Sequence, residues 1–253
     1  MYRMLFALPM FALLAWWAGR GRPALTRRDA VVIFGLGFSG YYLASFLDFL
    51  GLAYITASLE RLILYMNPTL VLAFSALFHG TRMTVRQMLA MGVSYAGVLL
   101  VFGQKVSLQG ADVALGTALC FGAAVSYALY LVFSGPEVRR LGALRLTGWA
   151  MGLACVLCIA QFVLLRPLSA AAVAPEVLWL SLLNATLCTF VPVLMVMMAI
   201  ERIGPTLTAQ TGMIGPLSTI ALGVLLLGEP FTPWLAAGTG LVLTGIWLLA
   251  KAR

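Results

Sequence analysis

Apolar runs of nearly membrane-spanning length follow one another along the chain, separated by short polar connections. A helix that crosses a bilayer needs about 20 mostly apolar residues. The first and fourth runs are short and need a few flanking residues to span. The pattern predicts an all-α polytopic membrane protein with a single membrane domain, because no polar stretch is long enough for a second domain. The expected spans are residues 4–18, 30–50, 57–78, 88–102, 113–133, 146–165, 178–198, 207–227 and 234–250.

Composition supports this fold class. Of 253 residues, 62% are hydrophobic and only 9% are charged, whereas soluble domains have about 25% charged residues. A soluble fold of this size could not cover so much apolar surface. The net charge is +8, but the basic residues lie in short loops between apolar runs. They therefore indicate orientation in a membrane, and we expect no nucleic-acid partner.

The basic residues are unequally divided between the two sides of the predicted bundle. One set of loops holds twelve Lys and Arg residues and the other set holds four. Cytoplasmic loops are enriched in Lys and Arg. We therefore expect a multi-pass protein of the cytoplasmic (inner) membrane, with its C-terminus in the cytoplasm and the N-terminus as written outside.

The chain repeats itself at an offset of 148 residues. With this shift Pro68 falls on Pro216, Gly92 on Gly240 and Gly97 on Gly245. Equivalent spans are five apart, and because five is odd the two halves cross the membrane in opposite directions. Such inverted repeats are a recurring architecture of secondary transporters. The predicted halves are residues 1–111, which lack a first helix, and residues 112–253.

Two segments also resemble a known family. The stretch AYITASLERLILYMNPTLVLAFSALFHGTRMTVRQMLAMGVSYAGVLLV and the stretch AIERIGPTLTAQTGMIGPLSTIALGVLLLGEPFTPWLAAGTGLVLTGIWLL are similar to the two repeat signatures of the EamA-type drug/metabolite transporters. Gly228–Glu229–Pro230 keeps the family's turn, while Gly80–Thr81–Arg82 departs from it. The resemblance implies an inverted-repeat bundle of ten helices that moves small metabolites, often outward.

Nine spans are one fewer than the ten that this resemblance implies. Subtracting 148 from 113–133, the first helix of the second half, places its counterpart before Met1. We expect either a true start upstream of Met1 or a native nine-helix variant. Reading the coding frame upstream would separate the two.

Paired prolines mark the first candidate site. Pro68 and Pro216 lie near the middle of equivalent spans, next to Asn67 and Gly215. Proline removes a helix hydrogen bond and frees a carbonyl, which in a bilayer must be satisfied by protein or by water in a cavity. Interrupted helices at corresponding positions indicate a transporter's binding site. A simple packing kink is the alternative.

A polar stripe extends this candidate cavity. Glu60 lies seven residues before Asn67, hence on the same helix face, and Thr208 and Thr211 continue the pattern in the second half. The alternative is hydrogen bonding between helices without a substrate. Three further cavity candidates in other spans are Tyr41, Tyr127 and Asn184.

Ionisable residues inside membrane spans are functional candidates. Asp48, Glu60 and Arg61 cluster near the outer face. They predict either a structural ion pair or proton coupling and gating at the outer mouth. The second half has no equivalents of these charges.

Other chemistry has weaker support. The serine in GLGFSG resembles that of intramembrane proteases, but the only histidine, His79, lies in a distant loop. The glycines of the same stretch fit a dinucleotide fingerprint, which needs a preceding strand. Cys155 and Cys158 form a lone CxxC that indicates helix packing. We therefore predict no enzyme, no cofactor and no metal.

The sequence thus predicts a secondary transporter for small metabolites, such as amino acids, other small organic solutes or drugs. It would work by alternating access, with export as the expected direction. Its partners would be the small-molecule substrate and the lipid bilayer, with proton coupling and a homodimer built on the Gly-rich fourth and ninth spans left open. The alternatives are an intramembrane enzyme that uses the GFSG serine and a non-transporting membrane assembly protein.

Overall fold

A computed structural model describes residues 1–55, 60, 63–80, 84–102, 112–212, 215 and 233–251. All regular elements within these ranges are helical. Five helical stretches are long and apolar enough to cross a membrane, which confirms the predicted all-α polytopic fold. They are Tyr2–Gly19, Arg27–Gly51, Val113–Leu141, Ala143–Leu165 and Pro175–Ile203.

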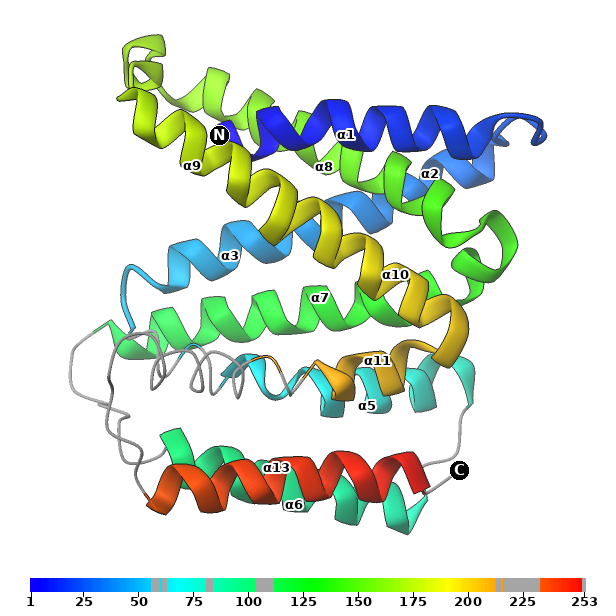
Figure 1. Ribbon diagram of the computed structural model, residues 1–253, viewed down its shortest axis with the longest axis vertical. Helices are drawn as coiled ribbons and strands as arrows, with labels where there is room; N and C mark the ends of the chain where they lie inside the picture. The colour runs from blue at the N-terminus through cyan, green and yellow to red at the C-terminus, as the bar shows by residue number, and fades with distance from the viewer. Residues whose placement is uncertain are drawn as a thin grey trace. The chain divides into compact units, whose positions relative to one another are not determined.

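Most described helices follow the predicted apolar runs (Figure 1), but a turn at residues 65 and 66 breaks the run 57–78, and a new helix starts at Asn67. The predicted span 207–227 lies outside the described residues, apart from its start and Gly215. In chain order the elements of the first part are α1 (Tyr2–Gly19), α2 (Arg27–Gly37), η1 (Phe38–Leu43), α3 (Ala44–Gly51), α5 (Asn67–His79) and α6 (Val85–Phe102). Those of the second part are α7 (Val113–Leu141), α8 (Ala143–Leu165), η3 (Leu168–Ala171), α9 (Pro175–Ala185), η4 (Thr186–Phe190), α10 (Val191–Ile203), α11 (Pro205–Thr211) and α13 (Pro233–Lys251).

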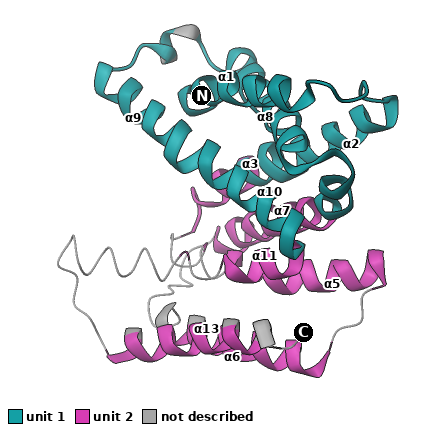
Figure 2. Ribbon diagram, turned by 45° about the vertical axis from the view of Figure 1, so that its right-hand side comes forward, with its two compact units in different colours: residues 1–45, 133–204 teal, residues 46–132, 205–253 magenta. Residues whose placement is uncertain are grey.

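The chain divides into two compact units (Figure 2). Unit 1 comprises residues 1–45 and 133–204, and unit 2 comprises residues 46–132 and 205–253. Each unit therefore takes helices from both of the halves that the sequence predicts, 1–111 and 112–253. The repeat and the compact units are different divisions of the same chain.

In unit 1, α1 packs along α8, and α8 also contacts α2, η1 and α10. The backbones approach closely at Gly148, where an added Cβ would lie 2.6 Å from the backbone nitrogen of Ala15. Small residues permit such close helix contact in membranes. Around this seam a buried apolar core includes Met4, Ala7, Phe11, Met151, Cys155, Ala185 and Val193.

In unit 2, α6 pairs with α13 through reciprocal glycine contacts. A Cβ on Gly97 would lie 2.6 Å from the carbonyl oxygen of Gly238. A Cβ on Gly245 would lie 2.7 Å from the carbonyl oxygen of Ala90. Both pairs, Gly97 with Gly245 and Ala90 with Gly238, differ by 148 residues. The two helices thus meet as equivalent partners, with backbone against backbone.

The same offset relates the starts of several elements. Helix α2 begins at residue 27 and α9 at residue 175, while α6 begins at 85 and α13 at 233. The two π-helical segments, η1 and η4, begin at 38 and 186. The offset that aligns prolines and glycines in the sequence therefore also aligns helix starts.

The glycine contact between α6 and α13 gives a stability prediction. Gly245→Ala should lower the free energy of unfolding by about 1–3 kcal/mol, because overpacking forces the two backbones apart. Gly240→Ala is the matched control, since a Cβ there meets no atom of the described residues within 4 Å. Thermal unfolding of both variants in the same detergent is the measurement. Equal unfolding midpoints would contradict the close contact.

Candidate functional site

The predicted site residues fall into both compact units. Tyr41 and Asn184 belong to unit 1. Arg61 and Pro216 lie outside the described residues. The other candidates belong to unit 2: Asp48, Glu60, Asn67, Pro68, Tyr127, Thr208, Thr211 and Gly215.

The helix that carries Pro68 is interrupted by a turn. Residues 65 and 66 form this turn, and the amide of Met66 donates to the carbonyl of Ile63 at 2.9 Å. Helix α5 then starts at Asn67, with the buried Pro68 in its first turn, where its missing N–H costs no helix bond. Because the turn breaks the helix, the seven-residue spacing does not fix the relative direction of Glu60 and Asn67. Their common face stays a prediction.

Helix α11 places its two threonines in different surroundings. Thr208 is buried, whereas Thr211 is exposed and its hydroxyl donates to the carbonyl of Leu207 in its own helix. Gly215 follows the end of α11 and is also exposed. Of the stripe's residues in the second half, Thr208 is buried whereas Thr211 and Gly215 are exposed.

Two buried amide oxygens on neighbouring helices lack partners. Oδ1 of Asn67 on α5 and Oε1 of Gln210 on α11 have no hydrogen-bond partner among the described residues. Helices α5 and α11 contact each other. Gln210 is 4% exposed and was not among the predicted residues, although a glutamine inside the apolar run 207–227 was a visible signal.

A second polar group of unit 2 forms where α3 meets α7. The backbones approach at Gly51 and Gly116, where a Cβ on Gly116 would lie 2.8 Å from Cβ of Tyr54. This contact brings the Cys120 thiol to 3.9 Å from the carbonyl oxygen of Asp48. The carboxylates of Asp48 and Glu60 both act electrostatically on that thiol. Two predicted candidates thus share a neighbour that the sequence did not indicate.

The aromatic and amide candidates have mainly structural contacts. Tyr41 packs against the apolar core of unit 1. Asn184 is exposed, and its carbonyl accepts from the hydroxyl of Thr189 at 3.1 Å. Tyr127 is half-buried and stacks on Tyr130, with ring centroids 5.8 Å apart.

Local chemistry explains the two π-helical segments. In η4 the following Pro192 lies at the start of α10, and proline cannot donate to the carbonyl four residues before it. In η1 the hydroxyl of Ser39 donates to the carbonyl of Gly35 at 2.8 Å and competes with the backbone ladder. The helices widen where these donors are missing or displaced.

Local contacts also define the surroundings of the GFSG serine, Ser39, and of the nearby glycines Gly35 and Gly37. Ser39 uses its hydroxyl on a backbone carbonyl of its own helix. Gly35 has nothing within 4 Å of a Cβ, whereas a Cβ on Gly37 would lie 3.2 Å from the carbonyl carbon of Ala150 on α8. Close packing of this helix therefore depends on Gly37 and not on Gly35.

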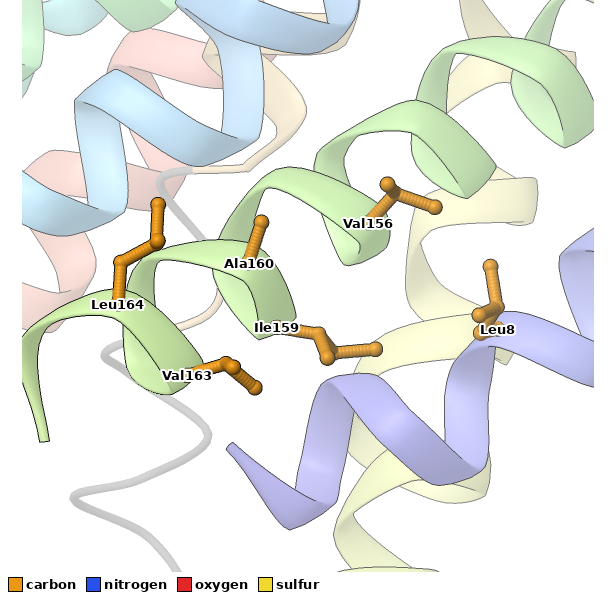
Figure 3. A pocket seen from close by; sticks show the side chains of 6 residues that line it. All are labelled: Leu8, Val156, Ile159, Ala160, Val163 and Leu164. Atoms are coloured by element: carbon orange, nitrogen blue, oxygen red, sulfur yellow. The ribbon is translucent and has the colours of Figure 1, made fainter. Parts of the chain in front are cut away.

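One pocket of unit 1 is wholly apolar (Figure 3). It has a volume of about 400 Å³ and lies between α1 and α8. Such a lining suits lipid chains and offers no group that would recognise a polar metabolite. Its lining residues are Leu8, Val156, Ile159, Ala160, Val163 and Leu164.

Charged residues gather at the start of α2 and the end of α7. A capping box starts α2, in which Thr26 Oγ1 accepts from the Asp29 amide at 3.2 Å and Asp29 Oδ2 accepts from the Thr26 amide at 2.8 Å. The buried Asp29 also pairs with Arg140, which bonds Glu137 at 2.7 Å. This network ties two helices of unit 1 together.

Comparison with known proteins identifies the family. The sequence profile of the EamA-like transporter family matches residues 1–103 and 114–251. The chain belongs to the EamA-like transporter family. This membership supports a transport role and confirms the resemblance stated above.

Relatives of this EamA-like chain are named as transporters, and their names give no substrate. "Uncharacterized transporter YcbK" of Bacillus subtilis is 30% identical over 244 residues, which cover 90% of this chain and 75% of YcbK. An "Uncharacterized transporter" of Archaeoglobus fulgidus is 24% identical over 231 residues, covering 89% and 79%. A solved structure titled "Crystal structure of protein" matches with a TM-score of 0.79 at 19% identity, covering 99% of this chain and 87% of that one. That likeness supports the fold alone.

The contact between α3 and α7 gives a chemical prediction. Cys120 is fully buried, whereas Cys188 is exposed. N-ethylmaleimide should therefore alkylate Cys188 in the folded, detergent-solubilised protein and reach Cys120 only after denaturation. Mass spectrometry of the labelled peptides is the measurement, with Cys188→Ser as the control for peptide assignment. Equally fast labelling of both thiols would show that the contact between α3 and α7 does not shield Cys120.

Proposed function

We propose that this EamA-like protein is a secondary transporter that moves small organic solutes across the cytoplasmic membrane by alternating access, in the outward direction. One observation carries the binding site: the unpartnered amide oxygens of Asn67 and Gln210 on neighbouring helices. The proposal includes a cytoplasmic C-terminus, as the distribution of basic residues predicts.

Buried acceptors without partners are uncommon and costly. Leaving one unsatisfied costs about 1–3 kcal/mol, and native proteins keep few such groups. A solute with N–H or O–H donors would satisfy both oxygens when it binds. Amino acids and small amines or alcohols have such donors, and this supports metabolites of that kind as the substrate class.

Interrupted helices support the same assignment. Helix α5 begins after a turn, and α11 ends at a turn before Gly215. Transporter sites are typically formed where such helices break, because the freed backbone groups can line a polar cavity. Asn67 and Gln210 lie next to these two breaks.

The carboxylates of Asp48 and Glu60 suggest that a proton gradient drives transport. The carbonyl oxygen of Asp48 lies 3.9 Å from the Cys120 thiol on α7, and Glu60 is 5% exposed. Buried carboxylates in membrane helices commonly belong to proton relays. We propose that Glu60 takes up and releases the coupled proton. A structural ion pair is the alternative, which the test below separates.

Two other functions can be tested beside transport. An enzyme would need Ser39 as its nucleophile, but that hydroxyl is bonded to the helix backbone. A non-transporting assembly protein would give no flux in proteoliposomes. A homodimer remains a proposal, for which Gly92 and Gly240 offer open faces on α6 and α13.

Loss of the Asn67 amide should impair transport selectively. Asn67→Leu should reduce flux roughly tenfold, the equivalent of one buried hydrogen bond to the substrate, while the protein still inserts. The measurement is flux of labelled amino acids and cationic drugs in proteoliposomes. Thr244→Val is the matched control, because that exposed threonine bonds only its own helix at Gly240. Normal flux in Asn67→Leu would place the site elsewhere. Ser39→Ala should leave the flux of a transporter largely intact, whereas it would abolish the activity of an enzyme.

Glu60 gives a pH prediction. Glu60→Gln keeps the shape of the side chain but cannot release a proton, so flux should lose its dependence on the pH gradient. Downhill exchange without a gradient should continue, which separates coupling from folding. Flux is compared with and without a proton gradient. Unchanged gradient dependence would leave Glu60 a structural role only.

A further inference from the structure

A polar pocket of about 360 Å³ lies within unit 1, at the turn between α7 and α8. It is lined by the end of α1, the Leu141–Arg145 turn and Glu201 of α10. Gly142 makes this turn possible, because it has a φ of +85° that other residues rarely adopt. The amides and carboxylates of the proposed transport site belong to unit 2.

Two arginines give the pocket a positive character. Arg22 donates to the carbonyl of Leu141 at 3.1 Å, and Arg145 donates to the carbonyl of Pro23 at 2.7 Å. A guanidinium has five N–H donors, so each arginine keeps donors for a ligand. Arg145 is only 8% exposed, and its Nε has no hydrogen-bond partner among the described residues. A buried guanidinium with unused donors is costly unless something anionic joins it.

The carboxylate of Glu201 neutralises only part of the positive charge of the two arginines. Its Oε1 accepts from the amide of Ala143 at 3.3 Å, in the first turn of α8. Two arginines and one glutamate therefore line the pocket, and that carboxylate already accepts from a backbone donor. The start of α8 adds positive potential, since Gly142 provides no side-chain cap.

The neighbouring aromatic residues indicate the level in the membrane at which this pocket lies. Trp17 lines it and is 60% exposed, and the guanidinium of Arg20 lies 3.6 Å over the ring of Trp16. Exposed tryptophans gather at the level of lipid headgroups. The exposed Trp17 therefore supports a place for this pocket at the level of the headgroups.

An apolar stripe continues from Arg145 along α8. Trp149, Gly152 and Val156 follow it at spacings of four, three and four residues, which places them on the same helix face. Trp149 and Val156 are exposed. Eleven residues of helix span about 16 Å, close to half of the roughly 30 Å hydrocarbon thickness. An acyl chain whose phosphate lay in the pocket would follow this stripe.

We propose that this pocket binds the phosphate group of an anionic phospholipid, held by Arg22 and Arg145. A soluble phosphate ester offers the same chemistry, but it would leave the apolar stripe unused. Basic pockets between membrane helices are known to take lipid headgroups. The site would anchor the α7–α8 turn to the leaflet.

The test measures retention of added phosphatidylglycerol by the full chain in detergent, using native mass spectrometry titrations. Wild type should hold phosphatidylglycerol more tightly than phosphatidylcholine. Arg22→Gln should weaken that binding about fivefold to tenfold, because it removes one charged contact, and Arg22→Lys should recover part of it. Arg22 is exposed, so these changes should leave folding intact, as the unfolding midpoint will report.

Arg139→Gln is the matched control, because Arg139 is exposed on α7, carries the same charge and does not line the pocket. It should retain phosphatidylglycerol as the wild type does. Equal losses in Arg22→Gln and Arg139→Gln would overturn the site in favour of general surface charge. Equal binding of phosphatidylcholine would overturn the anionic preference. Displacement of the lipid by equimolar glycerol phosphate would assign the pocket to a soluble ester and overturn the lipid.

Discussion

The absence of water from the bilayer core governs this structure. Backbone groups at that depth must be satisfied within a helix or by neighbouring protein, so every departure from the α-helical ladder needs a local cause. The widened segments η1 and η4 and the turn before α5 are such departures. Each has an identifiable cause, in Ser39, Pro192 or Pro68. Among the described residues, the polar groups that such departures release, together with the amides beside them, are candidates for contact with a polar solute.

The hydrophobic pattern predicted the fold class well, because bilayer thickness alone sets the length of an apolar run. The offset of 148 residues, found in prolines and glycines, also relates the starts of α6 and α13. The pattern could not show how a proline would act. Pro68 indicated an interruption, but whether the helix bends or stops depends on the neighbouring turn, so the spacing argument for Glu60 and Asn67 did not extend across it. Cys120 went unnoticed because a tertiary contact, and not local sequence, brings it to the carbonyl of Asp48. Gln210 was a visible polar residue in an apolar run, but only the fold shows that its amide oxygen is buried beside α5.

Buried polar groups in this protein fall into two kinds. Some are paired within the fold, such as Asp29 with Arg140, and the half-buried Thr69 and Tyr95 are paired in the same way. These pairs join helices and have little capacity left for a ligand. Others keep unused capacity, as Asn67, Gln210 and Arg145 do among the described residues. The first two are acceptors and the third is a cationic donor, so they suit different ligands. This difference between acceptors and a cationic donor distinguishes the proposed solute site from the proposed phosphate site, whatever the shape of each pocket.

The pairing of α6 with α13 has a consequence for biogenesis. Their glycine faces bring the two backbones into close contact, yet 148 residues separate the two helix starts along the chain. Helices enter the membrane in the order of synthesis, so α6 arrives long before its partner. During that interval the Gly97 face has only lipid or a temporary neighbour to contact, and small residues offer lipid little dispersion attraction. The newly made protein must therefore pass through a loosely packed intermediate that is completed only when the ribosome delivers α13. Quality-control proteases and insertases would encounter the chain at that stage.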